Sequence, residues 1–319
     1  MWEMRRWSYL DLGGGTEDTV LVAGSGRSGT TWVEELLNRN NDFRIMFEPF
    51  WGKQVREVRH FSDHQYLAPG NNDSRFVEPA GRILSGHVRN RWIDHQNTAH
   101  LPRRRLVKEI RANNWLGWAA DHWPHMPVIF IVRHPMAVVS SGKTLGWGDG
   151  LDRLLAQPNL LADHLDPDSE GYVRSLTDPW QRAIARWCIE NLVPFRTLGP
   201  TRATLVLYEV IASHSDDDID RMLEVVGQER DERLAEATVR PSRLARAGAS
   251  PSGSSNPAVR WLSEVDAPQR RQALAVIERL GFGDVYGDEP MPDAGAAHRL
   301  WAQAPPRTSS EEVGNSHGG

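Results

Sequence analysis

The chain of 319 residues has one cysteine, few lysines and no long apolar run. The single cysteine, Cys188, excludes an internal disulfide and lies in a helix-like stretch, so we expect it in the core. No group of Cys and His has zinc-site spacing, and we predict no metal. The longest clean apolar run covers only residues 128–132, too short for a membrane span or a signal peptide. We therefore expect a cytoplasmic protein without a membrane span.

The charge balance is mildly acidic, with 37 Lys and Arg, 42 Asp and Glu, and a formal net charge of −5. This balance argues against a general nucleic-acid binder. Only three cations are lysines, Lys53, Lys108 and Lys143, and such a bias is typical of a GC-rich bacterial genome. The length suits one α/β domain with a substantial core, and nothing in the composition indicates an oligomeric state.

A glycine-rich loop between a strand-like and a helix-like segment carries the strongest signal. After the apolar run 20–23 the chain reads Gly24-Ser25-Gly26-Arg27-Ser28-Gly29-Thr30-Thr31-Trp32. Such a turn directs backbone N–H groups at one point, and the helix N-terminus adds partial positive charge, so we predict an oxyanion site. The glycine spacing nearly matches that of nucleotide triphosphatases, but Thr30 stands where their lysine stands. Arg27 supplies the cation instead, which suits a diester-like group better than Mg-triphosphate.

A second strand–helix junction lies at Arg133. The continuous β-branched and aromatic run 128–132 indicates a strand buried on both faces, and Pro135 suits the first turn of a helix. Arg133 would then lie at the carboxyl end of a strand, where open α/β sheets bind ligands. Ser141 follows about two helical turns later, so the two side chains can share one phosphate.

Together the two segments resemble the PAPS-dependent sulfotransferases, in their soluble bacterial form. Gly26 to Trp32 resembles the 5′-phosphosulfate loop of that family, and Arg133-His134-Pro135 with Ser141 resembles its 3′-phosphate motif. The resemblance implies a P-loop-like three-layer α/β fold with a central, mostly parallel sheet flanked by helices. It also implies PAPS as the sulfuryl donor and PAP as the product. The residues that it assigns to the donor in these segments are Gly26, Arg27, Ser28, Gly29, Thr30, Thr31, Trp32, Arg133 and Ser141.

Two further segments are compared with the family. Leu205 to Glu209 is similar to its strand ending in Tyr-Glu, which implies that Tyr208 approaches the adenine; core packing of this ring is the alternative. The late basic loop departs from the family pattern, because residues 240–260 lack its Arg-Lys-Gly segment. We interpret this span as a lid in which Arg243 or Arg246 reaches the 3′-phosphate. A surface linker with incidental arginines is the alternative.

Sulfuryl transfer to a hydroxyl needs a base for the proton of the acceptor and a cation beside the leaving oxygen. Arg27 fits the second role by its position in the loop. We expect Glu48 to be the base, because the chain should return to the loop after the first helix. Bacterial and tyrosylprotein sulfotransferases carry a catalytic Glu at this position, which supports the assignment. Lys108 ends a strand-like run and is expected to touch the sulfuryl group, with a surface cation as the alternative.

Other roles are open for these residues. Glu48 can instead pair with a neighbouring arginine such as Arg44. Cytosolic members of the family use a His as base, in a Thr-His-Leu-Pro stretch that segment 106–110 lacks. His100 repeats only the letters His-Leu-Pro, and His87 and His134 are lesser candidates.

The chain is predicted to consist of an arm, one sulfotransferase domain and a disordered tail. Their bounds are 1–18, 19–287 and 288–319, with acceptor-side caps at 51–105 and 146–178. The predicted activity is in-line transfer of a sulfuryl group to a small-molecule hydroxyl, of a bacterial secondary metabolite or a lipid. A P-loop small-molecule kinase and a non-catalytic nucleotide-binding scaffold are the alternatives; the missing loop lysine weighs against the kinase.

Overall fold

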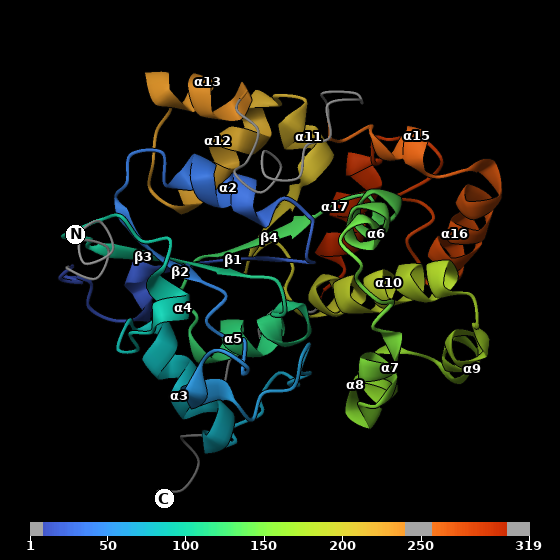
Figure 1. Cartoon of the computed structure of the whole chain (residues 1–319), viewed down its shortest axis with the longest axis horizontal. Helices are drawn as coiled ribbons and strands as arrows, with labels where there is room; N and C mark the ends of the chain where they lie inside the picture. Colours follow the sequence, from blue (N-terminus) through green and yellow to red (C-terminus); the bar gives the residue numbers. More distant parts are fainter. Residues whose placement is uncertain (1–8, 240–256, 305–319) are drawn as a thin grey trace, which may run out of the picture.

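The computed structural model describes residues 9–239 and 257–304 (Figure 1). In this part of the chain five parallel strands form one sheet in the order β2-β3-β1-β4-β5. The strands are β1 (Thr19–Gly24), β2 (Phe43–Phe47), β3 (Arg104–Glu109), β4 (Val128–Val132) and β5 (Thr204–Leu207). Because all run in one direction, their carboxyl ends share one edge of the sheet, and the loops that follow them meet there.

Helices cover both faces of the sheet, which gives three layers (Figure 1). One layer holds α2 (Thr30–Leu37), α11 (Tyr208–Ala212), α12 (Asp216–Val225) and α13 (Glu232–Val239). The other holds α3 (Ser74–Leu84), α4 (Arg91–Asp94), α5 (Leu116–His122) and α10 (Pro179–Thr197). In β1, Val20 and Val22 pack into the α2 layer, whereas Leu21 and Ala23 pack into the α10 layer. The apolar run is continuous because both faces of the strand are buried.

The remaining helices extend this core. Their bounds are α6 (Pro135–Thr144), α7 (Leu151–Leu155), α8 (Pro158–His164), α9 (Pro167–Ser175), α15 (Trp261–Glu264), α16 (Ala267–Arg279) and α17 (Ala294–Ala302). Short 3-10 turns are η1 (Thr16–Asp18), η2 (Arg56–Val58) and η3 (Asn113–Trp115). Proline stands in the first turn of α6, α10 and α16, and Asp178 and Asp266 cap the latter two. The starts of these three helices therefore follow local signals, as expected for the helix after Pro135.

The strand register places the predicted site residues at one edge. Gly24 of β1 pairs with Ile131 of β4, and Ala23 pairs with Glu109 of β3. Phe47 of β2 pairs with Lys108. The loop after β1, Glu48 after β2, the end of β3 and Arg133 after β4 consequently emerge side by side.

Strand β2 is an element that the sequence pattern concealed. We expected a loop–helix–loop unit to return the chain to Glu48, but a buried parallel strand returns it instead. Arg44 interrupts the apolar run Phe43–Phe47 and hides it as a strand. Its side chain is nevertheless fully buried, because carboxylates from distant segments pair with it.

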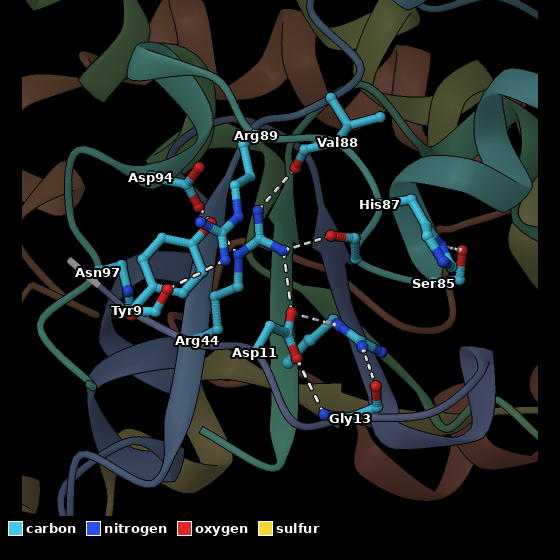
Figure 2. Close-up of polar contacts among 12 residues, drawn as sticks. Tyr9, Asp11, Gly13, Arg44, Ser85, His87, Val88, Arg89, Asp94 and Asn97 are labelled. Atoms are coloured by element: carbon cyan, nitrogen blue, oxygen red, sulfur yellow. Dashed lines mark hydrogen bonds and ion pairs between the residues drawn. The ribbon is translucent and has the colours of Figure 1, made fainter. Parts of the chain in front are cut away.

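The segment that precedes β1 is anchored rather than loose from Tyr9 onward (Figure 2). Tyr9 is buried, and the Arg89 guanidinium lies 4.3 Å from its ring centre. Asp11 pairs with Arg44 at 3.0 Å and with Arg105 at 2.8 Å. The expectation of a loose arm is wrong for these residues, since two buried arginines require the carboxylate of Asp11.

The expected disordered tail is also wrong in part, because residues 294–302 form α17. Trp301 is only 2% exposed and stacks on Phe130 of β4 with ring centres 5.9 Å apart. The ring of Phe195 in α10 contacts the Trp301 ring edge-on, with ring centres 5.5 Å apart. A few apolar residues in a polar, Pro-rich context are sufficient here because the sheet offers them a partner.

Candidate active site

The loop between β1 and α2 is a tight turn that requires glycine at position 29. The Ser28 N–H donates to the Ser25 carbonyl at 3.0 Å, while Arg27 and Gly29 adopt φ of 75° and 100°. A Cβ added at Gly29 would lie 2.3 Å from the Tyr208 ring, so glycine is required there for space as well as for its dihedral angle.

This turn fits an oxyanion. Helix α2 begins at Thr30 after Gly29, which has no side chain to cap it, and helix geometry leaves the N–H groups of Thr30 and Thr31 without a carbonyl partner in the helix. Ser28 is fully buried, and its hydroxyl has no hydrogen-bond partner within the described residues. Thr30 and Thr31 of the same turn are buried as well. An orphaned hydroxyl at an uncapped helix N-terminus is an arrangement that a phosphate-like group would satisfy.

Arg27 connects the two predicted donor-binding motifs. Its Nε donates to Ser141 Oγ at 2.9 Å, and its carbonyl accepts from Arg133 Nη1 at 2.9 Å. Arg133 Nη2 donates to the Pro257 carbonyl at 2.6 Å, while its Nε is buried without a partner in the described structure. Arg133 and Ser141 thus meet at Arg27, and one donor of the Arg133 guanidinium is left over.

Tyr208 begins α11 directly after β5 and lies against both motifs. Its ring centre lies 5.7 Å from that of Trp32 in an edge-on contact and 4.5 Å from the Arg133 guanidinium carbon. Burial raises the pKa of Tyr208, so the phenol stays protonated. The structure brings these three residues together; contact with an adenine remains a prediction.

Glu48, Lys108 and Arg111 form a charged group at the carboxyl ends of β2 and β3. Lys108 Nζ lies 2.6 Å from Glu48 Oε1, and Arg111 Nη1 lies 2.8 Å from Glu48 Oε2. Glu48 adopts a left-handed φ of 42°, and its N–H donates to the Lys108 carbonyl at 2.8 Å. The alternative of a pairing with an arginine is found, but its partner is Arg111 and not Arg44, which lies at the other end of β2.

The two cations set the charge of this carboxylate. Burial alone would raise the pKa of Glu48, but Lys108 and Arg111 outweigh that effect and lower it below its usual value. Glu48 is therefore ionised at neutral pH although it is only 6% exposed. Lys108 Nζ also lies 4.5 Å from the centre of the Phe47 ring.

The sequence interpretation missed Arg111 and the support that Glu109 provides. Glu109 is fully buried and accepts hydrogen bonds from the N–H groups of Phe50, Ile110 and Arg111 at 2.9 to 3.1 Å. We call the loop between β1 and α2 the anion loop. A Cβ added at Gly26 of this loop would lie 3.4 Å from Ile110, so the loop lies against the residue between Glu109 and Arg111. Several charges clustered directly after a strand-like run were the signal that could have identified this group.

The lesser histidine candidates are occupied elsewhere. The ring of His134 is fully buried and stacks on Trp261 with centres 4.3 Å apart, and burial lowers its pKa to about 4. His87 contacts Ser85 at 2.7 Å near the amino ends of the strands (Figure 2). His100 lies exposed in the loop before β3.

The two arginines predicted in the lid, Arg243 and Arg246, lie outside the described residues. The predictions of no metal site and no membrane span can be compared only with the described part of the chain. Within 9–239 and 257–304, no three His, Cys, Asp or Glu side chains are grouped so that they could hold a metal. None of the helices in these ranges combines the length and the hydropathy that a bilayer crossing demands.

A comparison with family profiles agrees with the family indicated by the motifs. The profile described as "Sulfotransferase family" matches residues 19–232, and the chain belongs to this family. Among solved structures, it is similar to the sulfotransferase domain of the Synechococcus PCC 7002 olefin synthase, with a TM-score of 0.43, 18% identity, and coverage of 84% of this chain and 96% of that one. It is also similar to the sulfotransferase domain of the curacin biosynthetic pathway, with a TM-score of 0.43, 14% identity, and coverage of 92% and 98%. A comparison with curated protein sequences finds no match.

Proposed function

We propose that the protein transfers a sulfuryl group from PAPS to the hydroxyl of a small molecule, a bacterial secondary metabolite or a lipid. The observation that carries the proposal is the contact of both donor motifs at Arg27. Its side chain reaches Ser141, and its carbonyl reaches Arg133. A nucleotide with an anionic group at each end would then be bound at its 5′ end by the uncapped helix and at its 3′ end by Arg133.

The residues divide the task as follows. When bound, PAPS supplies an activated sulfuryl group. Glu48 takes the proton of the acceptor hydroxyl while the acceptor oxygen forms its bond to sulfur, and the bond from sulfur to the phosphate oxygen breaks. Arg27 offsets the charge that appears on the leaving oxygen, and Lys108 stabilises the sulfuryl oxygens. Glu48 is deprotonated at neutral pH, as a base must be, although the lowered pKa also makes it a weaker base.

A lid over the nucleotide is part of the proposal. Segment 257–260 adjoins the span that contains Arg243 and Arg246, and its Pro257 carbonyl accepts from Arg133. Arg260 is close enough to contribute to the lowered pKa of Arg27, after burial and Arg133. The roles of Arg243 and Arg246 at the 3′-phosphate stay a prediction, since both residues lie outside the described part of the chain.

The donor is tested by calorimetry of PAP binding, with Mg-ATP as the competing ligand for a kinase. We expect PAP to bind and Arg133→Ala to weaken it, because this change removes a phosphate-binding guanidinium. Binding of Mg-ATP in preference to PAP would contradict the proposal. Transfer is then assayed with labelled PAPS and a panel of lipid, phenol, sugar and nucleoside hydroxyls. PAP binding without transfer to any acceptor by the wild type would favour the scaffold alternative.

A further inference from the structure

The buried side chain of Ser25 fixes the anion loop to α10 and η3. It is only 1% exposed, and its oxygen accepts from Asn191 Nδ2 at 3.1 Å and from Asn113 Nδ2 at 3.4 Å. Both amide groups are donors, so the hydroxyl hydrogen of Ser25 is left for a third partner. The buried carboxylate of Glu190, next to Asn191 on α10, is close enough to Ser25 for Ser25 to contribute to lowering the Glu190 pKa. Side chains of α10 and η3 therefore hold the loop.

Glu190 pairs with Arg186 and His64. It is fully buried in the middle of α10, with Arg186 Nη1 3.1 Å and His64 Nδ1 3.3 Å from Oε2. Burial raises the pKa of Glu190, but Arg186 and His64 outweigh it and lower the pKa below its usual value. Burial of a charged carboxylate costs free energy, and Glu190 requires all of its partners to offset that cost.

His64 is held in a strained conformation that aims its ring at Glu190. Its φ is 58°, and its carbonyl accepts from Asn114 Nδ2 at 2.9 Å and Gln157 Nε2 at 3.0 Å. Among the described non-glycine residues five have positive φ, and Arg27, Glu48 and His64 are three of them. Such strain gathers at functional sites, where the surroundings enforce it.

The residue before His64 reaches the other half of the site. The Asp63 carboxylate lies 3.6 Å from Arg111 Nε, and Arg111 pairs with Glu48. Two consecutive residues therefore contact the support of the anion loop on one side and the partner of the predicted base on the other.

We propose that Glu190 is a positioning residue: together with its neighbour Asn191, which donates to Ser25, and through its ion pair with His64, it holds the anion loop in place relative to the segment that meets the Glu48 group. This inference rests on the proposed function, because it takes the loop to be the donor site. Glu190 and Asn191 are consecutive on α10, so loss of the Glu190–His64 pair loosens the connection between the loop and the acceptor-side segment. Donor affinity then depends on a residue outside the loop.

The test compares PAP binding by calorimetry in wild type, His64→Ala and His64→Asn. We expect His64→Ala to weaken PAP binding by about fivefold or more, which is the lower range of typical coupling between sites. His64→Asn should stay within about twofold of wild type. Its Nδ2 can take the place of the imidazole Nδ1, and Asn tolerates positive φ.

His214→Ala is the matched control, since His214 has φ of 63° but is exposed between α11 and α12. It should leave PAP binding unchanged. If His64→Ala does not fold, Glu190→Gln provides the same comparison and should also weaken PAP binding, because its neutral amide attracts Arg186 and His64 less.

Unchanged PAP affinity in a folded His64→Ala or Glu190→Gln protein would overturn the positioning role. So would His64→Asn binding as weakly as His64→Ala, because the ring itself would then be needed. Failure of the wild type to bind PAP is a different result: it would refute the donor assignment and, with it, this inference.

Discussion

Strands β2 and β3 carry a buried charged cluster at each end. At their amino ends Arg44 and Arg105 pair with Asp11, and Arg44 also pairs with Asp94 (Figure 2). At their carboxyl ends Lys108 and Arg111 pair with Glu48. We call these the amino-end cluster and the carboxyl-end cluster. Both combine two cations with carboxylates on the same two strands, so charge alone does not distinguish them.

The clusters differ in how fully their donors are used. Arg44 donates four hydrogen bonds, two to carboxylates and two to the carbonyls of Gly86 and Val88. Arg105 donates three, one to Asp11 and two to the carbonyls of Gly13 and Gly15. In the described structure Lys108 Nζ donates only to Glu48. A cluster in which most donors are used serves as a clamp, whereas one with unused donors beside an anion loop has donors left for a ligand.

The sharpest way to break this comparison is to neutralise one carboxylate in each cluster. Glu48→Gln should lower the turnover of PAPS with the best acceptor by about 10²–10⁴-fold, the usual contribution of a positioned base. Asp94→Asn is the matched control, and its turnover per folded molecule should stay within about twofold of wild type. Full turnover by folded Glu48→Gln would remove the catalytic role from the carboxyl-end cluster.

Arg44→Met addresses the amino-end cluster. It leaves Asp94 and two backbone carbonyls buried without their donor, so we expect the free energy of unfolding to fall by about 3–5 kcal/mol. Denaturant titration followed by fluorescence measures it, and activity below the transition should persist. If the variant were as stable as wild type, this cluster would not be a clamp.

Lys108→Met tests whether the spare donors act on a ligand. Loss of a cation that acts on the reacting group should reduce turnover by about 10²–10³-fold. PAP affinity should change much less, because the proposed contact is with the sulfuryl group, which PAP lacks. An equal loss of PAP affinity and turnover would place Lys108 among the nucleotide-binding residues instead.

The pH dependence of kcat/KM should show the smallest effect. The folded-state pKa of Glu48 is depressed, so its ion pairs contribute stability above the unfolded-state value of about 4.3, and this is lost as the pH falls through the folded value. Activity needs the ionised carboxylate of Glu48. In the pH profile of wild-type kcat/KM, the acid limb, which is the loss of activity toward acid pH, should therefore lie below the unfolded-state pKa of Glu. Lys108→Met should move the limb to higher pH, since one cation is removed. A limb that moved to lower pH, or not at all, would contradict the pairing.

The sequence predicted the anchor points of the fold better than their surroundings. The strand at 128–132 and the helix after Pro135 follow from apolar burial and a proline in the first turn, which act within a few residues. Strand β2 could not be predicted, because the charge of Arg44 is compensated by Asp11 and Asp94, which are distant in sequence. Helix α17 escaped prediction for the same kind of reason, since Trp301 needs Phe130 as its partner.

The amino-acid sequence by itself determined the anion loop, the arginine after β4 and the family, because a turn that needs glycine and a helix that starts after it are local properties. Only the tertiary structure decided which charges meet. The parallel register pairs Lys108 with Phe47 and so places it beside Glu48. Arg44 lies near the amino end of β2, away from Glu48. The link from Ser25 to Asn191 and from its neighbour Glu190 to His64 joins three segments far apart in the chain. Ion pairs and buried hydrogen bonds depend on separations of a few ångströms in space, and folding alone determines these.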